Sequence, residues 1–283
     1  MPVSGATPPR QPSIFSQLLH PLLALVLPSA CALCAQELLG SLWGSLCSDC
    51  WRSLKRWTGA LCSRCGLPLT GSVDVPHPLC AVCRRNEPHF DLARSYGVYA
   101  GALRGAVLEV KFHQRERLGL RLGELLFDCW RPLESVVGLA APALIVPVPL
   151  HNSRERERGY NQAGLLARGL ARALKRSPGG SQAVFAANCL VRKHATPPQS
   201  GLSLRGRQEN VRGVFGVSDP RRLRQRDVIL VDDVMTTGAT ASACAAALKY
   251  AGAGRVLVLT LARATPQVTH GAPLLHALSA FGG

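Results

Sequence analysis

Eight cysteines in the N-terminal third of the chain have the type and spacing of metal ligands. They form four Cys-x-x-Cys pairs with 12, 11 and 14 residues between successive pairs: Cys31/Cys34, Cys47/Cys50, Cys62/Cys65 and Cys80/Cys83. A Cys-x-x-Cys turn places two thiolates on one side of a tight loop, and two such turns complete a tetrahedral four-sulfur site for Zn²⁺. The spacing therefore predicts two structural zinc ions. Consecutive pairing, with the first four cysteines on one ion, is the simplest arrangement, and an interleaved one stays open.

Disulfides and an iron–sulfur cluster are the alternatives for these cysteines. Disulfides need an oxidising compartment, and no convincing export signal precedes the first pair. Paired Cys-x-x-Cys hairpins fit zinc ribbons better than iron–sulfur sites. A closed four-sulfur site leaves no position for chemistry, so its expected role is structural, with contact to nucleic acid or protein. Three further cysteines lie in apolar surroundings and are expected to be small buried residues: Cys129, Cys189 and Cys244.

The run VILVDDVMTTGAT, residues 228–240, has the residues of a phosphate-binding loop. An apolar strand at 228–231 delivers Asp232 and Asp233 to its carboxyl end, where ligands bind in open α/β sheets. The segment that follows offers backbone N–H groups, hydroxyls and a helix N-terminus, which suit a phosphate; its residues are Met235, Thr236, Thr237, Gly238, Ala239 and Thr240. Two acids would repel that phosphate, so we expect them to bind sugar hydroxyls. An ordinary turn with Thr240 as helix N-cap is the alternative.

The elements that must position this loop begin near residue 91, where strand and helix patterns start to alternate. Apolar periodicity predicts strands at 95–99, 143–148, 228–231 and 256–261, and helices at 102–111, 118–130, 162–175 and 240–251. Continuous apolar strands between helices favour a parallel sheet covered on both faces. We expect four regions: a short helix and tail at 1–30, the zinc module at 31–90, the α/β domain at 91–265, and a tail at 266–283.

The basic charge of the chain is concentrated in one stretch. The whole chain has 33 Lys and Arg against 17 Asp and Glu, a formal charge of +16. Residues 150–226 hold 16 of these cations and 4 of the acids, a net +12, whereas residues 1–90 hold 7 and 4, a net +3. Such a block indicates a polyanionic ligand, namely nucleic acid, a phosphorylated metabolite or an acidic membrane. The alternative is that the charge reflects a proteome that is rich in Arg and has no connection with a ligand.

The apolar segment 14–27 is too short to cross a bilayer. It has 14 residues, His20-Pro21 interrupts it, and only Arg10 precedes it. A membrane span needs about 20 apolar residues, and a signal peptide needs a charged start. We expect a short amphipathic helix that packs on the body of the protein, no membrane span, and a cytoplasmic location, with a peripheral position at the inner membrane left open.

The residues 228–240 resemble the phosphoribosyl-diphosphate signature of the type I phosphoribosyltransferases at all 13 positions. The segments VPVPLHNSRERERGYNQA (146–163) and 192–215, together with the four Cys-x-x-Cys pairs, extend the likeness to the ComF family over residues 22–263. The resemblance implies a type I phosphoribosyltransferase-like α/β domain behind a zinc ribbon. It also implies that Asp232 and Asp233 hold the ribose, that residues 235–240 hold the 5′-phosphate, and that Mg²⁺ accompanies the diphosphate.

ComF-type proteins are associated with single-stranded DNA during natural transformation, so the resemblance implies DNA, phosphoribosyl diphosphate or a nucleotide, and other competence or recombination proteins as partners. The candidate contacts to DNA or diphosphate are Arg154, Arg156, Arg158, Asn161, Arg192, Lys193, Arg205, Arg207 and Arg212. Glu155 and Glu157 alternate with the first three arginines, so part of that run can be a solvated, self-paired face. Tyr160, Phe112 and Phe215 are candidate platforms for base stacking, with core packing favoured for Phe215.

Three functions fit these features. The first is the handling of single-stranded DNA during uptake. The second is a phosphoribosyltransferase of nucleotide salvage, although the sequence contains no segment that predicts a hood, the part of such enzymes that recognises the nucleobase. The third is a regulator that senses phosphoribosyl diphosphate or a nucleotide.

Overall fold

The computed structural model describes residues 29–38, 46–69, 75–138, 142–150, 152–177, 183–193 and 213–265. The helix expected at 14–27 and the tail from 266 lie outside these residues, as do Arg205, Arg207 and Arg212. No helix within the described ranges combines the length and the apolar character that a membrane span requires.

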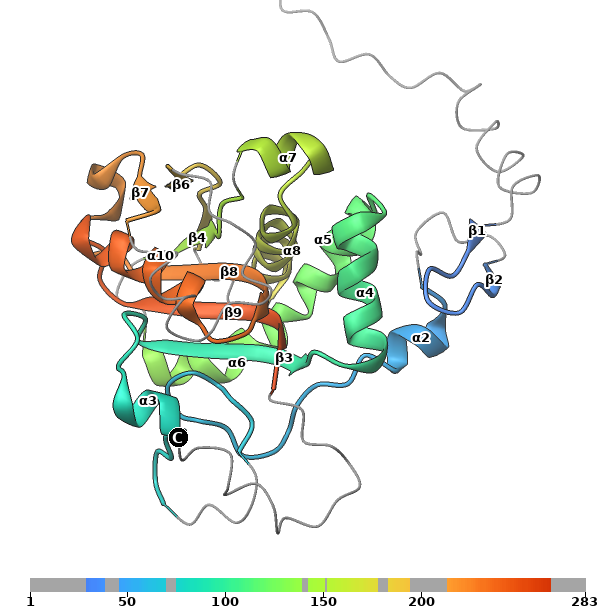
Figure 1. Cartoon of the computed structure of the whole chain (residues 1–283), viewed down its shortest axis with the longest axis horizontal. Helices are drawn as coiled ribbons and strands as arrows, with labels where there is room; N and C mark the ends of the chain where they lie inside the picture. Colours follow the sequence, from blue (N-terminus) through green and yellow to red (C-terminus); the bar gives the residue numbers. More distant parts are fainter. Residues whose placement is uncertain are drawn as a thin grey trace, which may run out of the picture.

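A five-stranded parallel sheet forms the centre of the protein, with the strand order β3-β9-β8-β4-β5 (Figure 1). Its strands are β3 (Leu92–Val98), β4 (Leu144–Pro147), β5 (Val184–Phe185), β8 (Val228–Met235) and β9 (Val256–Arg263). The expected parallel sheet is therefore confirmed. Strand β8 is longer than predicted, because its pairing with β9 continues from Asp232, opposite Thr260, to Met235, opposite Arg263.

Helices cover both faces of the sheet, as the unbroken apolar strands require. The helices of the α/β region are α4 (Gly101–Phe112), α5 (Glu116–Glu124), α6 (Leu126–Val137), α7 (Asn152–Arg158), α8 (Gln162–Arg176) and α10 (Ala239–Tyr250). Buried residues of α4, α5, α6 and α8 form one core cluster with Ile145, Ile229 and Leu257. Alternate residues of the same strands, such as Leu144 and Val228, point to the other face and pack with α10.

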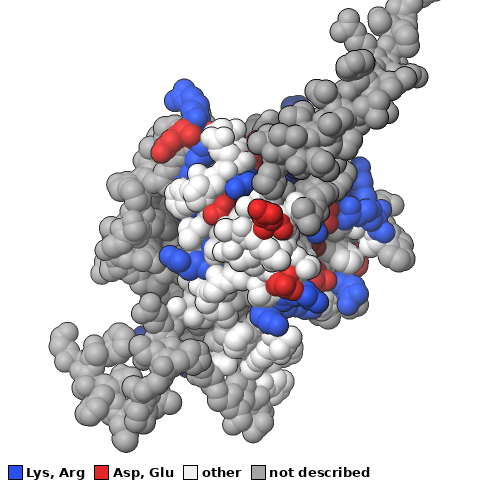
Figure 2. Space-filling view, turned by 90° about the vertical axis from the view of Figure 1, so that its right-hand side faces the viewer, with Lys and Arg blue, Asp and Glu red and all other residues white. Residues whose placement is uncertain are grey.

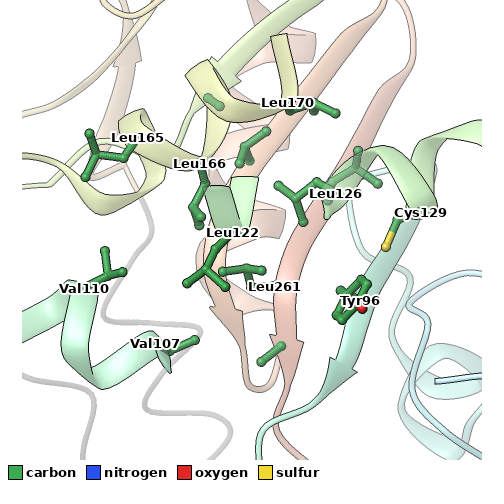
Figure 3. Close-up of a cluster of buried hydrophobic side chains, with 14 of the residues drawn as sticks. Tyr96, Val107, Val110, Leu122, Leu126, Cys129, Leu165, Leu166, Leu170 and Leu261 are labelled. Carbon is green, nitrogen blue, oxygen red and sulfur yellow. The ribbon is translucent and has the colours of Figure 1, made fainter. Parts of the chain in front are cut away.

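The first core cluster is built from leucine stripes on neighbouring helices. Figure 3 shows Leu165, Leu166 and Leu170 of α8 around Leu122 and Leu126, and all five are at most 4% exposed. The spacing of four residues between Leu166 and Leu170 places both on one face of α8, whereas Leu122 and Leu126 come from α5 and α6.

The single helix predicted at 118–130 is two helices, α5 and α6. The break lies at Leu125, whose N–H bonds to the carbonyl of Leu122, three residues back, at 3.1 Å. This tighter turn redirects the chain, so that α6 packs against β3 and β9 while α5 packs against α8.

The cysteine-rich region packs against both faces of the sheet. It contains a two-stranded hairpin of β1 (Ser29–Ala30) and β2 (Glu37–Leu38), and the short helices α2 (Ser48–Arg52) and α3 (Ala81–Arg85). Cys31 and Cys47 belong to the core cluster of α4, and Cys62 and Cys83 belong to that of α10. Figure 1 shows α3 below the start of β3 and α2 beyond its end. Each half of the region thus shares an apolar core with the sheet.

A small antiparallel hairpin and a 3₁₀ turn complete the described structure. The hairpin pairs β6 (Leu190–Arg192) with β7 (Phe215–Val217), and the turn is η1 (Pro220–Leu223). Leu223 is fully buried, which anchors the otherwise exposed and basic turn.

Candidate functional site

The acid pair lies in the last part of β8. The N–H of Asp233 donates to Oδ1 of Asp232 at 2.9 Å, and the N–H of Val234 donates to Oδ1 of Asp233 at 2.7 Å. Burial, reinforced by the neighbouring carboxylate of Asp233, raises the pKa of Asp232 well above its usual range. A pair of this kind favours hydroxyl or cation partners, which relieve the repulsion between the two acids.

The predicted phosphate loop follows the acid pair and turns directly into α10. Gly238 precedes the helix with φ 84°, and a β-carbon there would lie 2.7 Å from Cε of Met235. The N–H of Ala239 donates to Oγ1 of Thr237 at 3.3 Å. Gly238 is the N-cap residue, so the alternative in which Thr240 caps the helix is wrong. A glycine cap has no side chain over the helix end, which leaves room for an anion beside the first-turn N–H groups.

The C-terminal end of α4 lies on the same edge of the sheet as the acid pair. Parallel strands β3, β4 and β8 all end at this edge. The end of α4 is tied to it through Val110, whose carbonyl accepts from the hydroxyl of Tyr160 after α7. Lys111 lies close enough to Asp232 to oppose the rise in its pKa. Phe112 is 61% exposed, with Lys111 Nζ 5.8 Å and the Arg158 guanidinium 5.6 Å from its ring centre. The two cations hold cation–π positions over this exposed ring. A base that stacks on Phe112 would take their place, and the cations would then turn to its phosphates.

The junction between α7 and α8 positions the predicted basic run. Arg156 of α7 is exposed and Arg158 is half-buried; nothing is described of the Arg154 side chain. The hydroxyl of Tyr160 donates to the carbonyl of Val110, which ties the junction to α4. Tyr160 is therefore a half-buried anchor rather than an open stacking platform.

Asn161 already has partners for both of its amide atoms. Its Nδ2 donates to the carbonyl of Val148 at 3.0 Å, and its Oδ1 accepts from the N–H of Ala163 at 3.0 Å as the N-cap of α8. The structure thus gives Asn161 a capping role, which the sequence analysis missed although asparagine is a preferred N-cap residue.

Two more predicted cations lie on the β6–β7 hairpin. The Arg192 guanidinium is 5.6 Å from the ring centre of Phe215, which is 7% exposed. Core packing of Phe215 is thereby confirmed. Lys193 is exposed, and its N–H donates to the carbonyl of Val214 at 2.7 Å.

On the face that Figure 2 presents, the described charges do not form one continuous basic patch. Figure 2 shows basic side chains scattered around acidic ones on the face that it presents. Glu109 Oε1 lies 3.1 Å from Nδ1 of His113. Its Oε2 forms an ion pair with Arg115 at 3.7 Å, which neutralises part of the charge near α4. The cations around Phe112 are a local group within this mixed surface.

The eight cysteines form two four-sulfur clusters in consecutive order. Within each cluster the Sγ atoms lie within 4.8 Å of one another, and the clusters are Cys31, Cys34, Cys47 and Cys50, and Cys62, Cys65, Cys80 and Cys83. The sulfur separations of 3.7 Å for Cys34–Cys47 and 3.6 Å for Cys65–Cys80 fit a Zn²⁺ tetrahedron, in which a Zn–S bond of about 2.3 Å puts neighbouring sulfurs about 3.8 Å apart. None of these eight cysteines forms a disulfide.

Backbone donors prepare both clusters for metal. The N–H groups of Cys47 and Cys80 donate to Sγ of Cys31 and Cys62, both at 3.3 Å. Burial opposes ionisation of Cys31, yet backbone hydrogen bonds bring its pKa down to about 6. The same balance lowers the pKa of Cys62 to about 7. Burial instead raises the pKa of Cys65 to about 11, so the backbone donors favour the thiolate form at one cysteine of each cluster. Thiolates are the ligands that Zn²⁺ requires, so the two clusters are consistent with two structural zinc ions. Cys129, Cys189 and Cys244 are buried as expected.

Arg263, at the end of β9, is a site residue that was not predicted from the sequence. Its side chain is buried at 4% exposure, and Nη1 donates to the carbonyl of Thr236 in the phosphate loop at 2.7 Å. An arginine that ends an apolar strand run was the available signal, because a buried cation needs specific partners.

Comparison with known proteins places both modules in context. A family model described as a double zinc ribbon domain matches residues 22–84. The chain is 34% identical to the DNA utilization protein YhgH of Escherichia coli (strain K12), covering 84% of this chain and 99% of that protein. It is 33% identical to competence protein F of Haemophilus influenzae, covering 77% and 90%. It is 29% identical to competence protein ComFC of Bacillus subtilis, covering 45% and 52%. The crystal structure of TT1426 from Thermus thermophilus aligns with a TM-score of 0.30 and 20% identity, covering 53% of this chain and 84% of that one.

Proposed function

The chain belongs to the ComF family of DNA utilization and competence proteins, and from this premise we propose that it binds and handles single-stranded DNA during natural transformation. The names of the relatives support a role in DNA utilization or competence. The observation that carries the finer proposal is Phe112, an exposed ring flanked by Lys111 and Arg158 at the carboxyl edge of the sheet.

The phosphate loop on the same edge supports a second ligand in this proposal. Asp232 and Asp233 would hold ribose hydroxyls, and residues 235–240 would hold the 5′-phosphate of phosphoribosyl diphosphate or a nucleotide, with Mg²⁺ on the diphosphate. DNA and this ligand would then share one edge of the sheet and compete. The remaining cations predicted for DNA, Arg154, Arg156, Arg192, Lys193, Arg205, Arg207 and Arg212, stay proposed backbone contacts. The four regions proposed from the sequence and a cytoplasmic location remain part of the hypothesis.

Binding of a labelled oligo(dT) tests the DNA half of the proposal. Each phosphate contact to single-stranded DNA contributes roughly 0.7 to the negative slope of log K against log salt, so the slope should be about −2 if only Lys111, Arg156 and Arg158 bind phosphates and about −6 if all of the proposed cations do. Fluorescence anisotropy across a salt series measures this slope. An affinity that does not change between low and moderate salt would remove the proposed backbone contacts.

The Phe112→Ala variant tests the stacking platform itself. Loss of a base–aromatic stack costs about 1–3 kcal/mol, so the affinity for oligo(dT) should fall at least about fivefold. Tyr250→Ala is the matched control, because Tyr250 is 97% exposed at the far end of α10. Equal losses in the two variants would show that Phe112 has no special role.

A phosphoribosyltransferase is the second candidate, favoured by the intact acid pair at the end of β8. In this reaction the acceptor forms a bond to the anomeric carbon as the bond to the diphosphate breaks, and diphosphate leaves. Release of diphosphate from phosphoribosyl diphosphate, abolished by Asp233→Asn, would support it. Stabilisation by the ligand without any product would instead support the third candidate, a sensor.

A further inference from the structure

Arg263 connects the second cysteine cluster to the phosphate loop. Its Nη1 donates to the carbonyl oxygens of Thr236 at 2.7 Å and Met235 at 3.3 Å. Its Nη2 lies 3.7 Å from Sγ of Cys65. One guanidinium therefore contacts a metal ligand on one side and the backbone of the loop on the other.

The chemistry of these contacts explains why an arginine is buried here. A buried cation is stable only with compensating partners, and the two loop carbonyls and the cysteine sulfur are the partners that this site provides. When four thiolates hold Zn²⁺, the cluster keeps a net negative charge that attracts the guanidinium. The planar fork of arginine can face two acceptors at once, which a lysine ammonium cannot do with the same geometry.

Phe90 also lies between the second cysteine cluster and the phosphate loop. The ring of Phe90, which follows the second cluster in the chain, lies 3.7 Å from where a β-carbon on Gly238 would stand. The cluster and the loop also line one cavity of 1360 Å³, whose lining includes Cys65, Cys83, Arg263, Thr236 and Gly238.

We propose that Arg263 is a positioning residue through which metal occupancy of the second cysteine cluster fixes the conformation of the phosphate loop. The proposal rests on the proposed function only for the identity of the loop's ligand. With zinc bound, the thiolates hold Arg263, and Arg263 holds the carbonyls of Met235 and Thr236 so that the following N–H groups face the ligand. Without zinc, this support is lost and the loop opens more often.

The first cysteine cluster provides an internal control. Its buried members Cys31 and Cys47 pack in the core cluster of α4, on the other face of the sheet from Cys62 and Cys83. The two clusters have the same ligands and the same backbone donors, yet among the described contacts only the second reaches the loop through Arg263.

Hydrogen–deuterium exchange of the peptide that covers residues 235–242 tests the proposal without any ligand. The first site is removed by Cys34→Ser with Cys50→Ser, the second by Cys80→Ser with Cys83→Ser, and the link by Arg263→Met. We expect exchange in this peptide to rise about tenfold or more on loss of the second site or of Arg263, as for a lost hydrogen bond to a charged group, and to stay unchanged on loss of the first site. Unchanged exchange in Arg263→Met, or an equal rise on loss of the first site, would overturn the proposal.

The Zn²⁺ affinity of the second cluster can be measured even if the variant that lacks this cluster fails to fold. In the Cys34→Ser, Cys50→Ser background only the second cluster can bind metal, and chelator competition reports its affinity. Arg263→Met in this background should weaken Zn²⁺ binding by about 10- to 100-fold, as expected for a partner of a metal ligand, and Arg263→Lys should restore part of the loss. Equal affinities with and without Arg263 would contradict the link.

Titration with phosphoribosyl diphosphate separates this proposal from the proposed function. If the wild type binds this ligand, and the affinity falls about tenfold in Arg263→Met but not on loss of the first site, the result supports both the Arg263 link and the proposed function. If the wild type does not bind this ligand while exchange in the loop still depends on Arg263, the proposed ligand is wrong and the link stands. If the ligand binds equally well to wild type and Arg263→Met, the proposed function stands and the link is wrong.

Discussion

Replacing Gly238 with alanine should weaken phosphate binding and destabilise the fold, because this residue holds a left-handed conformation at the start of α10. Its φ is 84°, and the added β-carbon would lie 2.7 Å from Cε of Met235. A non-glycine residue in this conformation costs about 1–2 kcal/mol. Cε is the far end of a flexible side chain and can move, so the backbone conformation should dominate the cost. We expect the free energy of unfolding to fall by about 1–2 kcal/mol.

Chemical denaturation with and without phosphoribosyl diphosphate measures both effects. A ligand at 100 times its dissociation constant stabilises the folded state by about 2.7 kcal/mol. If the alanine turns the loop N–H groups away and weakens binding about tenfold, the same ligand concentration stabilises by only about 1.4 kcal/mol.

Gly252→Ala is the matched control at the other end of the same helix. Gly252 has φ 94° and open space around a β-carbon, so it should show a similar loss of stability with full stabilisation by the ligand. If Gly238→Ala kept the stability of the wild type, the left-handed conformation would be wrong. If both variants kept the full ligand effect, the loop would not be the phosphate site.

Three further outcomes follow from the structure. Leu122→Ala removes a fully buried side chain between α5 and α8 and should lower the free energy of unfolding in urea by about 2–5 kcal/mol; a loss below about 1 kcal/mol would contradict the packing. Burial raises the pKa of Asp227, but the hydrogen bonds and the charge of Arg255 outweigh it and lower this pKa in the folded state. The ionised Asp227 therefore stabilises the fold at neutral pH, and this stabilisation is lost as the pH falls below the pKa of an unfolded Asp, about 3.9. Asp227→Asn should accordingly flatten acid unfolding followed by circular dichroism, and an unchanged acid limb would refute this. Metal analysis should find about two zinc ions per chain, and a single ion would overturn the two-cluster arrangement.

The sequence predicted the parts of the site that depend on local patterns. The Cys-x-x-Cys spacing predicted two four-sulfur clusters and left their pairing open, with the consecutive order as the simplest arrangement; the sulfur atoms lie together in that order. Continuous apolar runs predicted the parallel strands, because such runs are buried on both faces. The loop after Asp232 and Asp233 was predicted from consecutive hydroxyl residues and a glycine between an apolar strand and a helix.

The features that the sequence did not predict depend on contacts between distant segments. Two acids normally end a buried strand, yet β8 continues through Asp232 because β9 offers paired backbone groups up to Arg263. The bond from Asn161 Nδ2 to the carbonyl of Val148 and the bridge made by Arg263 also depend on partners elsewhere in the chain, Val148 being 13 residues and Cys65 being 198 residues distant. Local patterns carry no information on such partners.

The strand order has a consequence for synthesis on the ribosome. Strand β9 is the last strand of the described chain, yet it lies between β3 and β8 in the sheet. The nascent chain cannot complete its sheet until residue 263 has left the exit tunnel, and until then β3 lacks its partner strand. The second cysteine cluster emerges earlier and binds β3 directly, since the N–H of Ala93 donates to the carbonyl of Arg64 at 2.7 Å. A ribbon that has bound its metal would thus cover part of the edge of β3 before β9 is synthesised, and would reduce aggregation through this unpaired strand during translation.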